Sequence, residues 1–127
     1  MNFEKVLFGF FVLLALTINF GFVMGDIDNP THHHAFELFV ALAVSLIATI
    51  MKLGDRSHIG ATLLATSLVA DLHLIAAAMV WGFNMHVAAA PDLASTTVTV
   101  VSLAGGALLA NFASVILLLI ETAMLRR

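Results

Sequence analysis

The segment AFELFVALAVSLIATIMKLGDRSHIGATLLATSLVADLHLIAAAMVWGF, residues 35–83, decides the fold of this chain. It consists of two apolar runs joined by a short turn that contains Lys52 and Arg56. Apolar runs of about 17 to 25 residues match the thickness of the hydrocarbon core of a bilayer. Each run therefore predicts a membrane-spanning helix, and the pair predicts a helical hairpin with a basic turn at one membrane surface.

A further apolar run lies on each side of this hairpin, which predicts four membrane-spanning helices in one domain of 127 residues. The expected helices cover residues 6–24, 30–51, 59–83 and 95–125. The turn GDIDNP, residues 25–30, ends the first helix, and we expect Asn29 to cap the second helix with Pro30 at its first position. The predicted fold is an all-α polytopic bundle.

The composition excludes several classes of protein. Hydrophobic residues make up 61% of the chain and charged residues only 10%, so lipid must cover much of its surface. There is no cysteine, and no basic patch that would bind nucleic acid. No nucleophile stands at a useful spacing from a base, and no phosphate-binding loop occurs, so we do not expect an enzyme.

The basic residues indicate the orientation in the membrane. Lys5 precedes the first apolar run, Lys52 and Arg56 lie between the second and third, and Arg126 and Arg127 follow the fourth. The other two connections contain no Lys or Arg. By the positive-inside rule, both termini and the central turn face the cytoplasm.

Small residues recur at helical spacing on three of the predicted helices. On the fourth helix they include Ser102, Gly106 and Ala110. Lipid provides no hydrophobic drive between helices, so membrane bundles pack through small residues that allow close backbone approach. Such stripes present more contact surface than four helices can bury, which favours a homo-oligomer.

Asp71 is the sharpest chemical feature, because it lies halfway along the third predicted helix. A carboxyl at that depth must be neutral, paired with another group or in contact with water. Ser45 and Asn111 lie at a similar depth, and a neutral Asp71 could donate a hydrogen bond to Asn111. Two interpretations stay open: a structural bond between helices, and a binding site for a proton or cation.

His73 lies two residues beyond Asp71 and therefore faces the opposite side of the same helix. Glu121 lies near the inner surface, close in sequence to Arg126 and Arg127. We expect an ion pair there, or a ring of carboxylates at the mouth of a pore if the fourth helix lines one. With Asp71, Ser45 and Asn111, Glu121 completes the candidate ion or proton site.

The predicted outer surface is rich in potential metal ligands. Imidazoles and carboxylates bind zinc, copper and nickel. The candidates are His32, His33, His34, Glu37, Asp26, Asp28 and His86. Adjacent histidines on a helix point about 100° apart, so the three could not share one ion. The alternatives to a transition-metal site are a solvated cluster and an outer face that responds to acid.

Four segments of the chain are distinctive: GDIDNP (25–30), HHH (32–34), KLGDRS (52–57) and SLVADL (67–72). They resemble segments of a family of small uncharacterised bacterial membrane proteins. The resemblance implies a bacterial inner membrane and four spans, but no activity.

Two functions remain open for a chain embedded in the lipid bilayer. One is an oligomeric channel or transporter that moves a cation or proton past Asp71. The other is a non-conducting accessory or assembly subunit of a larger membrane complex.

Overall fold

A computed structural model describes residues 3–26, 29–55, 57–88 and 92–125. It contains the four helices α1 (Phe3–Val23), α2 (Ala35–Lys52), α3 (His58–His86) and α4 (Leu93–Leu125), and a short 3₁₀ turn, η1 (Pro30–His32). Each of the four α-helices is long and apolar enough to cross a membrane. The predicted all-helical fold is confirmed, and the chain has the features of a multi-pass membrane protein.

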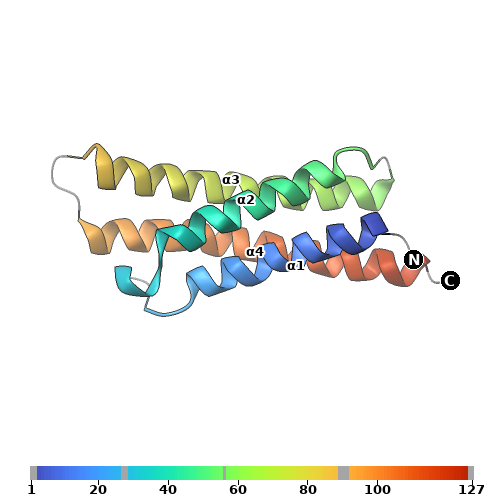
Figure 1. The fold of residues 1–127 in the computed structure, drawn as a ribbon, viewed down its shortest axis with the longest axis horizontal. Coiled ribbons are helices and arrows are strands. Elements are labelled where there is room, and N and C mark those ends of the chain that lie inside the picture. Colours follow the sequence, from blue (N-terminus) through green and yellow to red (C-terminus); the bar gives the residue numbers. More distant parts are fainter. Residues whose placement is uncertain (1–2, 27–28, 56, 89–91, 126–127) are drawn as a thin grey trace.

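The four helices form a bundle in which each packs against two neighbours (Figure 1). α1 contacts α2 and α4, and α3 contacts the same two helices. The start of α1, the α2–α3 turn and the end of α4 lie together at one end of the bundle. We call this the basic end, because Lys5 and Lys52 lie there, and the opposite end, which holds His33, the histidine end.

The connection between α1 and α2 differs from the expected one. Asn29 does act as a cap, since its side-chain oxygen accepts a hydrogen bond from the Thr31 amide at 3.0 Å. However, the helix that it caps is only η1, and α2 begins at Ala35 rather than at Pro30. His33 and His34 have extended backbone, because His33 is held by contacts to the end of α1 that are described below.

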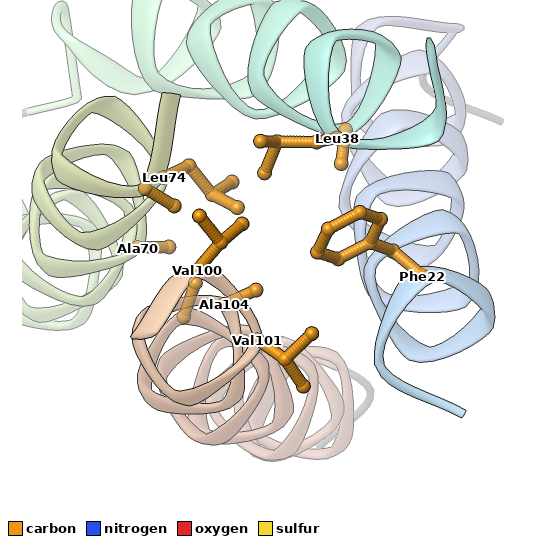
Figure 2. Close-up of a cluster of buried hydrophobic side chains, with 10 residues drawn as sticks. Phe22, Leu38, Ala70, Leu74, Val100, Val101 and Ala104 are labelled. Atoms are coloured by element: carbon orange, nitrogen blue, oxygen red, sulfur yellow. The ribbon is translucent and has the colours of Figure 1, made fainter. Parts of the chain in front are cut away.

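Two apolar clusters fill the bundle. The larger lies toward the histidine end and takes residues from all four helices, which converge on the bundle axis (Figure 2). We call it the outer cluster; its buried members are Phe22, Leu38, Ala41, Ala70, Leu74, Ala77, Val100, Val101, Ala104 and Ala107. A smaller inner cluster of Phe8, Val12, Ala48 and Leu63 lies toward the basic end. Buried polar residues occupy the region between them.

The predicted packing stripe of α4 is only partly in contact with the rest of the bundle. Gly106 lies against α3, and a Cβ at this position would come within 2.5 Å of the His73 ring. Ala110 packs at the edge of the outer cluster, but Ser102 is exposed. A Cβ at Gly105 would meet nothing within 4 Å. The close approach of α3 and α4 therefore depends on Gly106.

Candidate functional site

Asp71 lies buried in the middle of α3, and its carboxyl faces α2. Only 4% of its surface is exposed. The Ser45 hydroxyl donates to Oδ1 at 2.6 Å, and the Thr49 hydroxyl lies 2.5 Å from Oδ2. Ser45 and Thr49 are four residues apart, which places them on one face of α2. Ser45, which the sequence places at a similar depth to Asp71, therefore contacts it, and Thr49 is a third member of the site.

The Thr49 hydroxyl has two acceptors within reach. Besides Asp71 Oδ2, the carbonyl oxygen of Ser45 lies 2.9 Å from Thr49 Oγ1. A hydroxyl group carries one proton and can also accept. If Asp71 is ionised, that proton must be shared between two acceptors. If Asp71 carries a proton on Oδ2, it can donate to Thr49, and Thr49 can donate to the Ser45 carbonyl.

Asn111 does not bond to Asp71, so that part of the prediction is wrong. When the Asn19 amide of α1 is assigned the orientation that satisfies its hydrogen bonds, its side-chain oxygen accepts from Asn111 Nδ2 at 3.1 Å. The Asn19 amide also bonds to the Ala104 carbonyl and the Leu108 amide of α4, at 3.1 and 3.0 Å. Asn19 and Asn111 therefore form a buried bridge between α1 and α4, separate from the α2–α3 contact at Asp71.

His73 faces away from Asp71, as its position two residues further along α3 predicts. Its Nδ1 lies 2.9 Å from the carbonyl oxygen of Val69 in the same helix, and its ring covers Gly106 of α4. The α3–α4 contact is also joined by Thr66 and Ser114, whose hydroxyls lie 2.6 Å apart. α3 thus presents a carboxyl to α2 and a histidine to α4.

Charged side chains meet inside the basic end. Glu121 is 6% exposed; its Oε1 accepts a hydrogen bond from Lys5 at 3.3 Å, and its Oε2 lies 3.9 Å from Lys52 Nζ. Lys52 is also buried and contacts Asp55 Oδ2 at 2.9 Å. The sequence predicts Glu121 beside Arg126 and Arg127, which lie outside the described residues. That pair stays a prediction, and within the described residues Glu121 joins α4 to α1 and α2.

A cavity of about 540 Å³ opens at the basic end beside these charges. Its lining includes Lys5, Lys52, Asp55 and Glu121, together with the apolar side chains of Phe8 and Leu118. A cavity of this size with charged side chains in its wall is roomy enough for several water molecules, each of which needs a few polar partners. The cavity therefore brings the aqueous side close to the buried charges.

The turn between α2 and α3 holds Asp55 in its ionised form. Hydrogen bonds from Lys52 and from the amide and hydroxyl of Ser57 keep the pKa of Asp55 well below its usual range. The same carboxyl lies where a Cβ at Gly60 would be, which explains a glycine in the first turn of α3. Asp55 is therefore a fixed anion beside Lys52.

This anion predicts a specific pH dependence for Asp55→Asn. The unfolded carboxyl titrates near its ordinary pKa of about 4, whereas the folded carboxyl stays ionised to lower pH. The stabilisation is thus fully present above about pH 4 and is lost as the pH falls toward the folded pKa. Wild type should melt slightly higher than Asp55→Asn at neutral pH, and the margin should shrink in acid. A margin that persists unchanged to about pH 2 would contradict this assignment.

His33 joins α1 to the turn at the histidine end. Its Nδ1 lies 2.5 Å from the carbonyl oxygen of Phe22, and its Nε2 lies 2.7 Å from that of Asp26. A neutral imidazole has one N–H, so only the doubly protonated ring could donate to both oxygens. Because both ring nitrogens face carbonyl groups, this arrangement leaves His33 no lone pair directed at a metal ion.

The other predicted metal ligands are dispersed. His34 is exposed, Glu37 lies beside Gly21 of α1, and the His86 ring packs edge-on against Trp81, with the ring centroids 5.5 Å apart. Among the residues that the structure describes, no three of His, Asp and Glu lie close enough to hold one metal ion. Asp28 and the His32 side chain lie outside that description, and the transition-metal site stays a prediction.

Comparison with known families places the chain in a family. The sequence profile described as a family of unknown function (DUF6394) matches residues 32–122. Because the match covers most of the chain, the protein belongs to this family, which confirms the resemblance to an uncharacterised one. The match includes the segments 32–34, 52–57 and 67–72, whereas 25–30 precedes it. No curated protein and no solved structure matches the chain.

Proposed function

We propose that this member of the DUF6394 family binds and releases a proton at Asp71, as the working site of a membrane channel or transporter. The observation that carries the proposal is the pair of hydroxyl groups on the two carboxyl oxygens. Asp71 is buried at mid-helix and its hydrogen-bond partners are neutral. A carboxyl in such a place is costly, and costly intramembrane acids mark proton and ion pathways.

The count of hydrogen atoms favours a proton over a metal cation as the bound species. A protonated Asp71 completes a chain in which Ser45 donates to Asp71, Asp71 to Thr49, and Thr49 to the Ser45 carbonyl. Each hydroxyl group then donates one hydrogen bond, and the Asp71 carboxyl, the Thr49 hydroxyl and the Ser45 carbonyl each accept one. A metal cation prefers several oxygen ligands at short distance, whereas this site offers one carboxyl and two hydroxyls that already bond to it.

The surroundings of Asp71 favour proton exchange through the basic end. Toward the histidine end, Asp71 is followed on α3 by Leu74 and Ala77 of the outer cluster, which fills that part of the bundle with apolar groups. Toward the basic end the inner cluster is smaller, and Thr49 is followed one turn later on α2 by Lys52, which lines the cavity. The positive-inside rule supports a cytoplasmic location for the basic end and both termini, so the proton would come from the cytoplasm.

Asp71→Asn tests this function because it keeps the shape of the side chain and removes the titrating group. Purified wild type in vesicles should dissipate a pH gradient, and Asp71→Asn should lose most of that flux while keeping its particle size. The infrared band of a protonated carboxyl should disappear in the same variant. Asp92→Asn, a change in the loop before α4, is the matched control and should behave as wild type. Absence of proton flux in wild-type vesicles would refute the proposal.

A non-conducting accessory role is the second candidate, and the outward face of α4 favours it. Ser102 is exposed, and Gly105, three residues later, has open space where a Cβ would be. Glycine inside a helix costs about 1 kcal/mol relative to alanine, so a packing partner would justify it. Particle mass in mild detergent separates the alternatives: a symmetric homo-oligomer supports conduction, and a larger complex with other proteins supports the accessory role.

A further inference from the structure

We propose that Lys52 is a positively charged gate that decides which species pass from the cavity at the basic end to Asp71. The inference rests on the proposed role of Asp71, but the accessibility of the α2 face can be measured independently of proton flux. Lys52 is only 7% exposed, which is unusual for a lysine. A buried ammonium needs compensating partners, and those partners reveal what holds this one in place.

Three groups from different parts of the bundle surround the Lys52 ammonium. Asp55, in the α2–α3 turn, lies 2.9 Å from Nζ, and Glu121 of α4 lies 3.9 Å away. The ring of Phe8 in α1 lies beneath the ammonium, with its centroid at 4.6 Å, a cation–π distance. The side chain is thus fixed by α1, α4 and the turn, and the two carboxylates act as its latch.

The position of Lys52 on α2 places it between the cavity and Asp71. Lys52, Thr49 and Ser45 follow one another at spacings of three and four residues and are all buried, so they share one inward face. Lys52 lines the cavity, and the other two bond to Asp71. A species that leaves the cavity along this face meets the ammonium before it meets Thr49.

A fixed positive charge in front of a buried site is a barrier to cations, and proteins use such charges to exclude cations from pores. The barrier acts on metal cations and on hydronium alike, whereas a neutral molecule of similar size is not repelled. Asp71 is then enclosed by the outer cluster on one side, and by Lys52 together with the inner cluster on the other. Movement of Lys52 away from the α2 face would open the site to the cavity.

The absence of cysteine from the chain allows a direct test with single thiols. Thr49→Cys places a thiol beyond Lys52, and Met51→Cys places one in the cavity wall. Each full-length variant would be reconstituted in vesicles and treated with methyl methanethiosulfonate, which is neutral, and aminoethyl methanethiosulfonate, which is cationic. For each variant, the measured quantity is the rate of the neutral reagent divided by the rate of the cationic reagent. This ratio should be at least roughly tenfold larger at Thr49→Cys than at Met51→Cys, because the Lys52 ammonium repels the cationic reagent.

Lys52→Met should remove this preference at Thr49→Cys and leave the ratio at Met51→Cys unchanged. Glu121→Gln removes one of the two carboxylates that hold Lys52 in place and should also reduce the preference. It serves as the test if Lys52→Met does not fold. Lys5→Met, at the other lysine that contacts Glu121, is the control and should retain the preference. An unchanged ratio in both gate variants, or no reaction of the Thr49→Cys thiol with the neutral reagent, overturns the inference. If the gate variants change the ratio but wild type carries no proton flux, the inference about Lys52 stands and only the proposed function is refuted.

Discussion

Gly106→Leu should disrupt the packing of α3 against α4 and lower the stability of the whole bundle. A Cβ at this position would come within 2.5 Å of Cδ2 and 2.7 Å of Nε2 of His73, so even alanine requires the ring to move. Overpacking of this kind costs about 1–3 kcal/mol and occasionally more. Leucine adds three further carbon atoms in the same direction. The melting temperature and the particle size in detergent measure the effect.

Gly105→Leu is the matched control, since it introduces the same side chain one residue away. A Cβ there meets nothing within 4 Å, so one copy of the bundle can accept leucine without a clash. Leucine also has a better helix propensity than glycine by most of 1 kcal/mol, so Gly105→Leu should not destabilise a single copy. Equal melting temperatures for the two variants would show that the His73 contact with Gly106 does not limit packing.

Thr49→Val should destabilise the bundle nearly as strongly, although it leaves the size of the side chain almost unchanged. Valine cannot hydrogen-bond, so Oδ2 of Asp71 would lose its partner inside the protein. A buried polar group without a partner costs about 1–3 kcal/mol. Adding Ser45→Ala removes the remaining partner, and the double variant should unfold at a lower temperature than either single variant.

Thr99→Val provides the control for the loss of a threonine hydroxyl. Thr99 donates to the carbonyl of Ser95 in its own helix, as Thr49 can to Ser45, but it is exposed. Its replacement should change the melting temperature little. If Thr49→Val and Thr99→Val had the same small effect, the contact between Thr49 and Asp71 would contribute nothing measurable to stability.

The fold could be predicted from the sequence because each span is a separate signal. The apolar runs are long, and the turns between them contain Gly, Pro or charged residues that end a helix without reference to the rest of the chain. The start of α2 could not be predicted in this way. Asn29 and Pro30 form a local cap, but His33 contacts the carbonyl groups of Phe22 and Asp26, and these long-range contacts extend the backbone.

Within the candidate site, the sequence predicts how deep each polar residue lies in the membrane, but not which residue it hydrogen-bonds to. Asp71, Ser45 and Asn111 all lie near mid-helix, yet only Ser45 contacts Asp71, because α2 rather than α4 faces that side of α3. Asn111 bonds to Asn19, and nothing in the local sequence of α1 marks Asn19 as its partner. Thr49 could have been found from its spacing, four residues after Ser45. Threonines in helices commonly bond to their own backbone, which hides such a signal.

The charged groups of the basic end show a different limit. From the sequence, Lys52 is predicted to lie at the end of a membrane span, where it contributes to the positive-inside pattern. Its burial arises because Phe8, Asp55 and Glu121 converge from three parts of the chain. Nothing in the local sequence indicates that this lysine is enclosed while Lys5 is half-exposed. Buried ion pairs between distant segments require the tertiary structure.

The unequal lengths of the helices have a consequence for the surrounding lipid. At a rise of about 1.5 Å per residue, the 18 residues of α2 extend about 27 Å and the 33 residues of α4 about 50 Å. A hydrocarbon core of about 30 Å therefore fits α2 closely and is far shorter than α4. The α3–α4 side must therefore tilt, protrude or thicken the adjacent leaflets, whereas α2 becomes too short only in a thicker bilayer, so the two sides respond differently to acyl-chain length.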